Sequence, residues 1–334
     1  MGYILTPEEF GNSIQKLQES YRIFAPVKKT GEGRFFDTDV VRYDYVHSAE
    51  EMELQEKSDY PFREILTPLS ETLFYFVEDE CRSKEVEKEE VIVLLRACDL
   101  NAVKRLDDMY LHNGAEEDWF YAQKREHVHF ALIGCPESFE NCFCVSMGSN
   151  KADNYVFSVD EADGEYRIDV KDGEFNDIFS AGKPTDVVPA SVTENKQKVS
   201  LPEEFPASIR NDELWNEYDS RCINCGRCNF VCPTCTCFTM QDIFYTDNGR
   251  VGERRRVQAS CMVDGYTTVA GGGQYRRKNG ERMRFKVMHK IYDHKKRFGY
   301  NMCVGCGRCD DVCPEYISYI TILQKAAKAA EEAE

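Results

Sequence analysis

The stretches RCINCGRCNFVCP at residues 221–233 and MCVGCGRCDDVCP at residues 302–314 repeat one cysteine pattern. Each reads Cys-x2-Cys-x2-Cys-x3-Cys-Pro, the ferredoxin-type run that holds a [4Fe–4S] cube. Three thiolates on a tight loop reach three irons of one cube, and glycines such as Gly226, Gly305 and Gly307 let the backbone wrap closely around it. The repeat predicts two cubes and a chain that carries electrons.

The fourth cysteine of each run is expected to bind the other cube, because the chain points away after it. One predicted ligand set is Cys222, Cys225, Cys228 and Cys313. The other predicted set is Cys303, Cys306, Cys309 and Cys232. Structural zinc also uses Cys-x2-Cys pairs, but it requires two separated pairs and gives no reason for the full run to occur twice.

Length and composition limit the class of protein. With 334 residues the chain can form about two domains. Sixteen cysteines without an apolar N-terminal segment indicate metal ligation in a reducing cytoplasm rather than disulfides. No apolar run is long enough to span a membrane. The net charge of -17 disfavours binding to nucleic acid or to an anionic membrane surface.

The charge is unevenly distributed. Fourteen Lys and Arg against four acids lie between Arg250 and Arg297. This basic insert either folds back onto the acidic body or forms a docking face for an acidic partner, where charge would set orientation and encounter rate.

The sequence predicts an α+β protein, with a βαβ unit as its clearest element. Residues 91–98 and 128–135 are continuous apolar runs typical of buried strands, and a helix is expected between them at 99–111. The remaining predicted elements are a helix of about fifteen residues after Thr6, strands at 21–27 and 34–46, a helical stretch near Pro61 that includes Leu66, Leu69 and Leu73, a hairpin at 155–161 and 165–170, and a solvent-exposed C-terminal helix.

Three segments follow from these elements. Residues 1–180 are expected to form an N-terminal α/β domain with a partly parallel sheet. Residues 181–205 mix Pro, Ser, Thr, Lys and Glu without a period, which is typical of a linker. Residues 206–334 are expected to form a ferredoxin-like dicluster domain with a long insert between the two cysteine runs.

Four further cysteines indicate a third site, in the N-terminal domain. Cys98 and Cys135 end the two predicted parallel strands, and Cys142 and Cys144 follow in one short loop. The carboxyl edge of a parallel sheet is where α/β folds place their sites. We therefore predict a third [4Fe–4S] cluster there, with zinc or ordinary buried thiols as the alternatives. Cys81 is expected to be a buried thiol.

The remaining thiols exceed what these clusters need. Cys235, Cys237 and Cys261 are interpreted as packing beside the clusters, where they would tune potential. His289 and His294 are expected to be solvated rather than metal-binding. The chain has no nucleotide, flavin or siroheme motif of its own, so no catalysis is expected from it alone.

Over residues 90 to 315 the chain resembles the A subunit of anaerobic sulfite reductase. The specific elements are PTCTCF after the first run, ASCM at 259–262, and RACD with GC and CFC in the N-terminal domain. The likeness extends to the iron–sulfur β subunits of soluble cytoplasmic [NiFe] hydrogenase and sulfhydrogenase complexes. It implies an electron-transfer subunit between a flavin- and NAD(P)H-binding subunit and a siroheme subunit that reduces sulfite to sulfide. The sequence also leaves open a free-standing large ferredoxin and a reductase that is catalytic in its own right.

Overall fold

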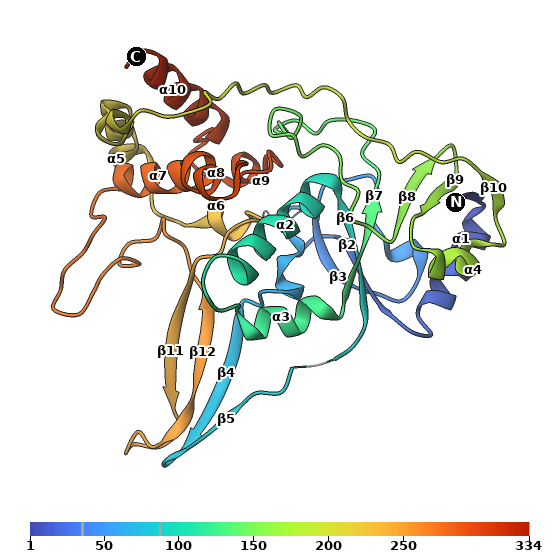
Figure 1. Cartoon of the computed structure of the whole chain (residues 1–334), viewed down its shortest axis with the longest axis horizontal. Helices are drawn as coiled ribbons and strands as arrows, with labels where there is room; N and C mark the ends of the chain where they lie inside the picture. The colour runs from blue at the N-terminus through green and yellow to red at the C-terminus, as the bar shows by residue number, and fades with distance from the viewer. Residues whose placement is uncertain (35–36, 87, 334) are drawn as a thin grey trace.

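The computed structural model describes residues 1–34, 37–86 and 88–333, and an eight-stranded sheet forms its centre (Figure 1). The strand order is β10-β1-β9-β8-β7-β6-β2-β3. Strands β2, β6, β7 and β8 run parallel, and all other neighbours are antiparallel. The bounds are β1 Gly2–Leu5, β2 Arg22–Lys29, β3 Val40–Val46, β6 Val91–Arg96, β7 Val128–Ile133, β8 Phe157–Ala162, β9 Glu165–Val170 and β10 Lys183–Thr185. The predicted partly parallel sheet is confirmed.

Helices cover both faces of this sheet, which is why β6 is buried along its whole length and is apolar up to Arg96. Ile92 and Leu94 pack in one core with residues of α1 (Pro7–Leu17). Val91 and Val93 pack in a second core with residues of α2 (Ala97–Leu111) and α3 (Trp119–Glu126). The second core also contains Val304 and Cys306 of the second cysteine run. The run is therefore packed directly against the α/β part of the chain.

Local patterns near the N-terminus form the predicted elements. Thr6 and Glu9 form the predicted capping box of α1, although the helix has eleven residues rather than about fifteen. The hairpin β8–β9 turns at Asp163 and Gly164, which both have positive φ as a two-residue hairpin turn requires. Of the strand predicted at 34–46, residues 40–46 form β3, and 35–36 lie outside the described residues.

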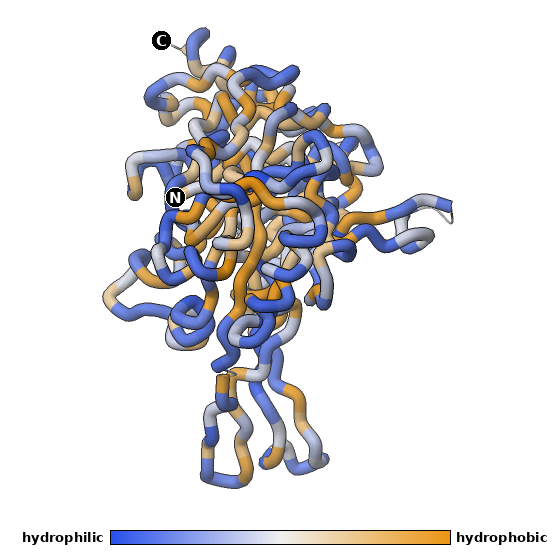
Figure 2. The backbone as a smooth tube through the Cα atoms, turned by 90° about the vertical axis from the view of Figure 1, so that its right-hand side faces the viewer, coloured by the Kyte–Doolittle hydropathy of each residue, from blue (hydrophilic) through white to orange (hydrophobic). Residues whose placement is uncertain are grey.

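A second sheet forms an arm that extends from the body (Figure 2). Its order is β11-β12-β4-β5, with bounds β4 Ser70–Val77, β5 Glu80–Ser83, β11 Phe238–Phe244 and β12 Val251–Gln258. The helix predicted near Pro61 is therefore wrong: a short 3-10 helix at Phe62–Ile65 is followed by β4, which contains Leu73. The basic insert supplies β12, and β12 pairs with β4 across the two halves of the sequence.

The C-terminal part is mainly helical. Its helices are α5 Glu217–Arg221, α6 Arg227–Phe230, α7 Asn279–Met288, a π-helix at His289–Asp293, α8 His294–Phe298, α9 Arg308–Val312 and α10 Tyr319–Glu331. The shorter helices elsewhere are α4 Asn176–Phe179 and 3-10 turns at Ala49–Glu51, Gly173–Phe175, Ala207–Asn211 and Glu213–Asn216. The prediction of a solvent-exposed tail is wrong, because Leu323 and Ala326 of α10 are fully buried in the C-terminal core. Among the described residues, no helix is both long and apolar enough to cross a membrane.

The segment predicted as a linker is attached to the N-terminal part. Within it, β10 pairs with β1, and Ser191 bridges to Cys135. Asn195 is buried and accepts a hydrogen bond from Val145 N at 2.7 Å. The domain boundaries themselves remain a prediction.

Candidate iron–sulfur centres

The first predicted ligand set lines one cavity. Its four cysteines come from the loop after α5, from α6 and from the end of α9, and they are Cys222, Cys225, Cys228 and Cys313. Gly226 has φ +72°, and a Cβ there would lie 2.7 Å from Val263. The tight loop that presents these thiols therefore requires glycine at this position. Ile317 N also donates to Cys313 Sγ at 3.3 Å.

The second predicted set lines an adjoining cavity. Its members are Cys303, Cys306, Cys309 and Cys232. Cys232 of the first run thus lies beside the thiols of the second run, and the crossed ligation itself stays a prediction. Cys228, Cys309, Lys286 and Tyr319 line both cavities, so the two cavities share a wall.

The third predicted set also comes together. A third cavity is lined by Cys98, Cys135, Cys142 and Cys144. Cys98 lies in the first turn of α2 directly after β6, and Cys135 lies two residues after β7. The parallel register of these strands brings their carboxyl ends to one edge of the sheet.

The loop at 141–144 joins the second and third cavities. Phe143 lines the second cavity, and its N–H donates to Gly305 O at 2.8 Å. Cys142 Sγ, which faces the third cavity, donates to Cys306 O at 3.4 Å. A Cβ on Gly307 would lie 2.2 Å from Asn141 O. The two loops are therefore in direct backbone contact, which puts the second cavity between the other two.

Burial sets the thiol chemistry. Loss of hydration raises the pKa of Cys303 to about 11 and that of Cys306 to about 12. Burial also acts on Cys232, but the Lys290 ammonium beside it lowers the pKa of that thiol below its ordinary value. Metal ligation requires thiolates, so binding of iron at these sites would release protons.

The lining of the cavities fits an anionic cube. Tyr319 lies in the shared wall, and its buried hydroxyl has no hydrogen-bond partner among the described residues. Lys286 is also buried there beside Cys228, where its positive charge opposes the rise that burial causes in the pKa of the Cys228 thiol. The Tyr319 hydroxyl and the Lys286 ammonium could each donate a hydrogen bond to a cluster sulfide or to a ligating thiolate. No three Cys, His, Asp or Glu side chains in the described part of the chain converge closely enough for one metal ion.

A buried ion pair lies between the second and third cavities. Arg308 donates to both carboxylate oxygens of Asp99 at 2.7 Å, and these side chains are 2% and 0% exposed. Arg308 also donates to Ser58 O at 2.8 Å. No sequence pattern indicates this pair, because its partners are more than 200 positions apart.

Three thiols outside the predicted sets form a separate group. Cys235, Cys237 and Cys261 lie close to one another, and Asn229 donates to Cys261 Sγ at 3.1 Å. They line none of the three cavities. The prediction that Cys81 is buried is wrong, because this thiol is exposed on β5.

The prediction that both histidines are solvated is also wrong. His294 is buried, and its Nδ1 lies 2.9 Å from Tyr300 O. His289 stacks on Phe285 with ring centroids 5.7 Å apart, and burial lowers its pKa to about 4.

Part of the basic insert pairs with acids of this chain, including all three arginines at 254–256. Arg254 binds Asp242 at 2.6 Å, and Arg256 is buried against Glu71 at 2.7 Å. Arg255 pairs with Glu253. These contacts favour the interpretation that the insert folds back onto the body over a role for these arginines in docking.

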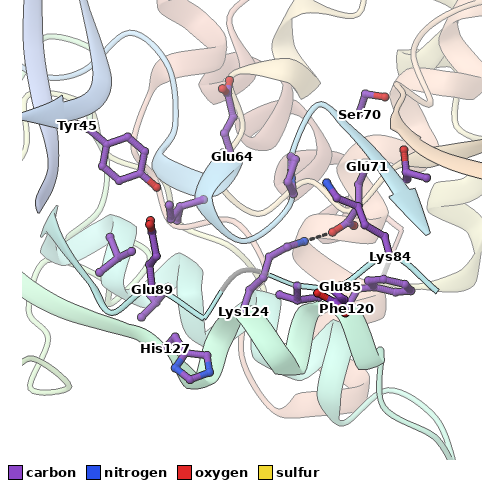
Figure 3. A pocket seen from close by; sticks show the side chains of 16 residues that line it. Tyr45, Glu64, Ser70, Glu71, Lys84, Glu85, Glu89, Phe120, Lys124 and His127 are labelled. Atoms are coloured by element: carbon purple, nitrogen blue, oxygen red, sulfur yellow. Dashed lines mark hydrogen bonds and ion pairs between the residues drawn. The ribbon is translucent and has the colours of Figure 1, made fainter. Parts of the chain in front are cut away.

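A larger cavity without thiols, of about 310 Å³, lies between β4 and α3 (Figure 3). Lys124 pairs with Glu71 in it, and burial lowers the pKa of Lys124 despite that carboxylate. Glu64, Glu89 and Lys84 also line it. Because both charge signs are present, the cavity indicates no particular ligand.

Comparison with known proteins identifies the family. Residues 221–317 match the family model described as a 4Fe-4S dicluster domain. The chain is 30% identical over 348 residues to sulfhydrogenase 2 subunit beta of Pyrococcus furiosus, and the match covers 97% of this chain and 98% of the relative. No solved structure matches the chain. The protein belongs to the iron–sulfur β-subunit family of which this sulfhydrogenase subunit is a member, and it contains a 4Fe-4S dicluster domain.

Proposed function

We propose that this chain is the electron relay of a multi-subunit oxidoreductase and that it holds three [4Fe–4S] clusters in a row. The observation that carries the proposal is that three sets of four cysteines line three successive cavities. The ligands would be the twelve cysteines of the three sets described above. Zinc in the third cavity is the alternative occupant, and it would require the four thiols to move closer together around one ion.

Each cluster, when bound, would take up and release one electron at a time. Residues of the chain lie between neighbouring sites and would keep the three clusters in a row. The wall made by Cys228, Cys309 and Lys286 separates the first two sites, and the contact between Phe143 and Gly305 separates the second from the third. In the second site Cys306 is buried, and Cys232, Cys303 and Cys309 are partly buried. Cys225 is exposed, so the first site is accessible to a redox partner.

The partners are proposed from the relative and from the sequence resemblance. The name of the Pyrococcus furiosus relative favours a sulfhydrogenase-type complex. The second candidate is an anaerobic sulfite reductase, because PTCTCF and the CFC loop resemble its A subunit. In either complex a flavin subunit that binds NAD(P)H would split a two-electron donor into single electrons. The acceptor would be a hydrogenase large subunit or a siroheme subunit.

Reconstitution with purified subunits tests this function. The isolated chain is expected to be bleached by dithionite but not by NAD(P)H, and to reduce neither sulfite nor protons. Adding a flavin partner should confer bleaching by NAD(P)H. Sulfide production after addition of a siroheme subunit would select the sulfite reductase, and hydrogen production with a hydrogenase subunit would select the sulfhydrogenase. Turnover by the chain alone would contradict the relay.

Single cysteine variants test the ligand sets. Cys306→Ser is expected to remove one cube, or about a third of the iron, and leave the first cube intact. Cys232→Ala should perturb the same EPR signal as Cys306→Ser. If Cys232→Ala perturbs the signal that Cys225→Ser removes, the crossed assignment is wrong.

A further inference from the structure

Two lysines are buried on one face of the helix that borders the first two cavities. Lys286 lies on α7 and Lys290 on the following π-helix, and each is 5% exposed. Their spacing of four places them on the same helical face. Among the described residues, no carboxylate lies within ion-pair distance of either ammonium. Two like charges buried together without an anion would be strongly destabilising.

Lys290 belongs to the second cavity alone. Its Nζ donates to Thr234 O at 2.8 Å and to Thr234 Oγ1 at 2.7 Å, and that hydroxyl is 3.4 Å from Cys232 Sγ. Its carbonyl accepts from Met302 N at 2.8 Å and from Cys303 N at 3.2 Å. Single π turns in helices often occur at functional sites, and this one ties Lys290 to cysteines of both runs.

Lys286 lies in the wall between the cavities. It lines both of them together with Cys228, and its ammonium lies 5.0 Å from the ring centre of Tyr319. The other charged residues of the first cavity, Arg227 and Glu315, are exposed and of opposite sign. Water screens their effect, whereas the charge of Lys286 acts through the protein interior.

We propose that the missing counter-charge of Lys286 and Lys290 is the bound clusters and that these lysines set the cluster potentials. Lys286 would raise the reduction potential of both C-terminal clusters, and Lys290 would raise that of the second cluster only. The reason is electrostatic. Reduction adds negative charge to an already anionic cube, and a fixed ammonium nearby stabilises the reduced form more than the oxidised form. The inference rests on the proposed function, because it requires clusters in these cavities.

An EPR-monitored redox titration of the reconstituted full chain tests the inference. The signals are assigned with Cys225→Ser for the first cluster and Cys306→Ser for the second. Lys290→Met is expected to disfavour reduction of the second cluster about tenfold, which lowers its reduction potential by about 59 mV for one electron. The reduction potential of the first cluster should change by less. Lys286→Met is expected to lower both potentials.

Matched variants separate charge from packing. Lys290→Arg retains the charge and should stay close to the native potential, and Lys296→Met removes an exposed lysine of the next helix and should change neither. Should Lys290→Met lose its iron, Lys290→Gln, which keeps a donor for Thr234, replaces it in the same comparison. If the unmodified chain takes up no iron on reconstitution, the proposed function is overturned. Normal iron with unchanged potentials in the lysine variants would overturn only this inference.

Discussion

At the scale of single residues, the contact between the second cysteine loop and the N-terminal loop depends on the absence of a side chain. Gly307 has φ +73° and lies against the backbone of Asn141, and a Cβ on Gly305 would lie 2.6 Å from the backbone of Phe143. Backbone cannot move aside as a side-chain end can, so these two positions accept only glycine. From the sequence, these glycines were expected to let the backbone wrap closely around a cluster. The sequence did not indicate that the same glycines also let a second loop approach.

Gly307→Ala is expected to destabilise the chain and to lower the iron content of the second and third sites. The new Cβ would overlap Asn141 O at 2.2 Å. Gly299→Ala is the matched control, because Gly299 has φ +88° and nothing within 4 Å. The control should lose about 1–2 kcal/mol from backbone strain alone and keep its iron. Equal losses in the two variants, by denaturant unfolding and iron assay, would show that the contact is unimportant.

The buried pair of Asp99 and Arg308 supports a second prediction at this scale. Asp99→Asn removes the charge and leaves a buried guanidinium without its anion, which should cost about 3–5 kcal/mol of unfolding free energy. Glu194→Gln breaks an exposed pair with Lys198 and should cause no measurable change. A native midpoint for Asp99→Asn in urea unfolding would contradict the role given to the pair.

At the scale of elements, local patterns predicted the helices and strands that form from adjacent residues, and missed those that depend on distant ones. The capping box of α1 and the turn of β8–β9 are determined by a few neighbouring side chains. Strand β4 instead pairs with β12, about 180 positions later. Leu66, Leu69 and Leu73 fit a helical period, but pairing with the distant β12 makes the part from Ser70 onward, with Leu73, a strand. The same reason explains the buried α10, whose apolar face meets a core built from distant segments.

The helix that carries the two lysines also predicts a pH dependence, through His289. Burial lowers the pKa of this imidazole to about 4, below its ordinary value of about 6.5 in an unfolded chain. Below pH about 6.5 the unfolded chain therefore binds a proton that the folded chain does not, and stability falls as the pH drops towards about 4. His289→Phe keeps the stacking on Phe285 and should remove this part of the slope. An identical slope in unfolding free energy against pH would contradict the assignment.

At the scale of the whole molecule, the cysteine spacing predicted two crossed ligand sets, and the members of each set line one cavity, with Cys228 and Cys309 lining both. It could do so because each run is a local unit and the pseudo-twofold repeat fixes how the two exchange a ligand. The third set was predicted from strand ends, since parallel strands bring their carboxyl ends together. The order of the three cavities could not be predicted, because it depends on the packing of residues 141–144 against Gly305 and Gly307.

The iron and acid-labile sulfide content of the anaerobically reconstituted protein tests most directly whether three clusters lie in a row in one chain. Three cubes predict about twelve irons and about twelve sulfides per chain. About eight irons and about eight sulfides would show that the third site holds no cluster. One zinc beside about eight irons would show that the third site holds a structural zinc ion instead. A chain that binds zinc without sulfide at all three sites would contradict the electron relay.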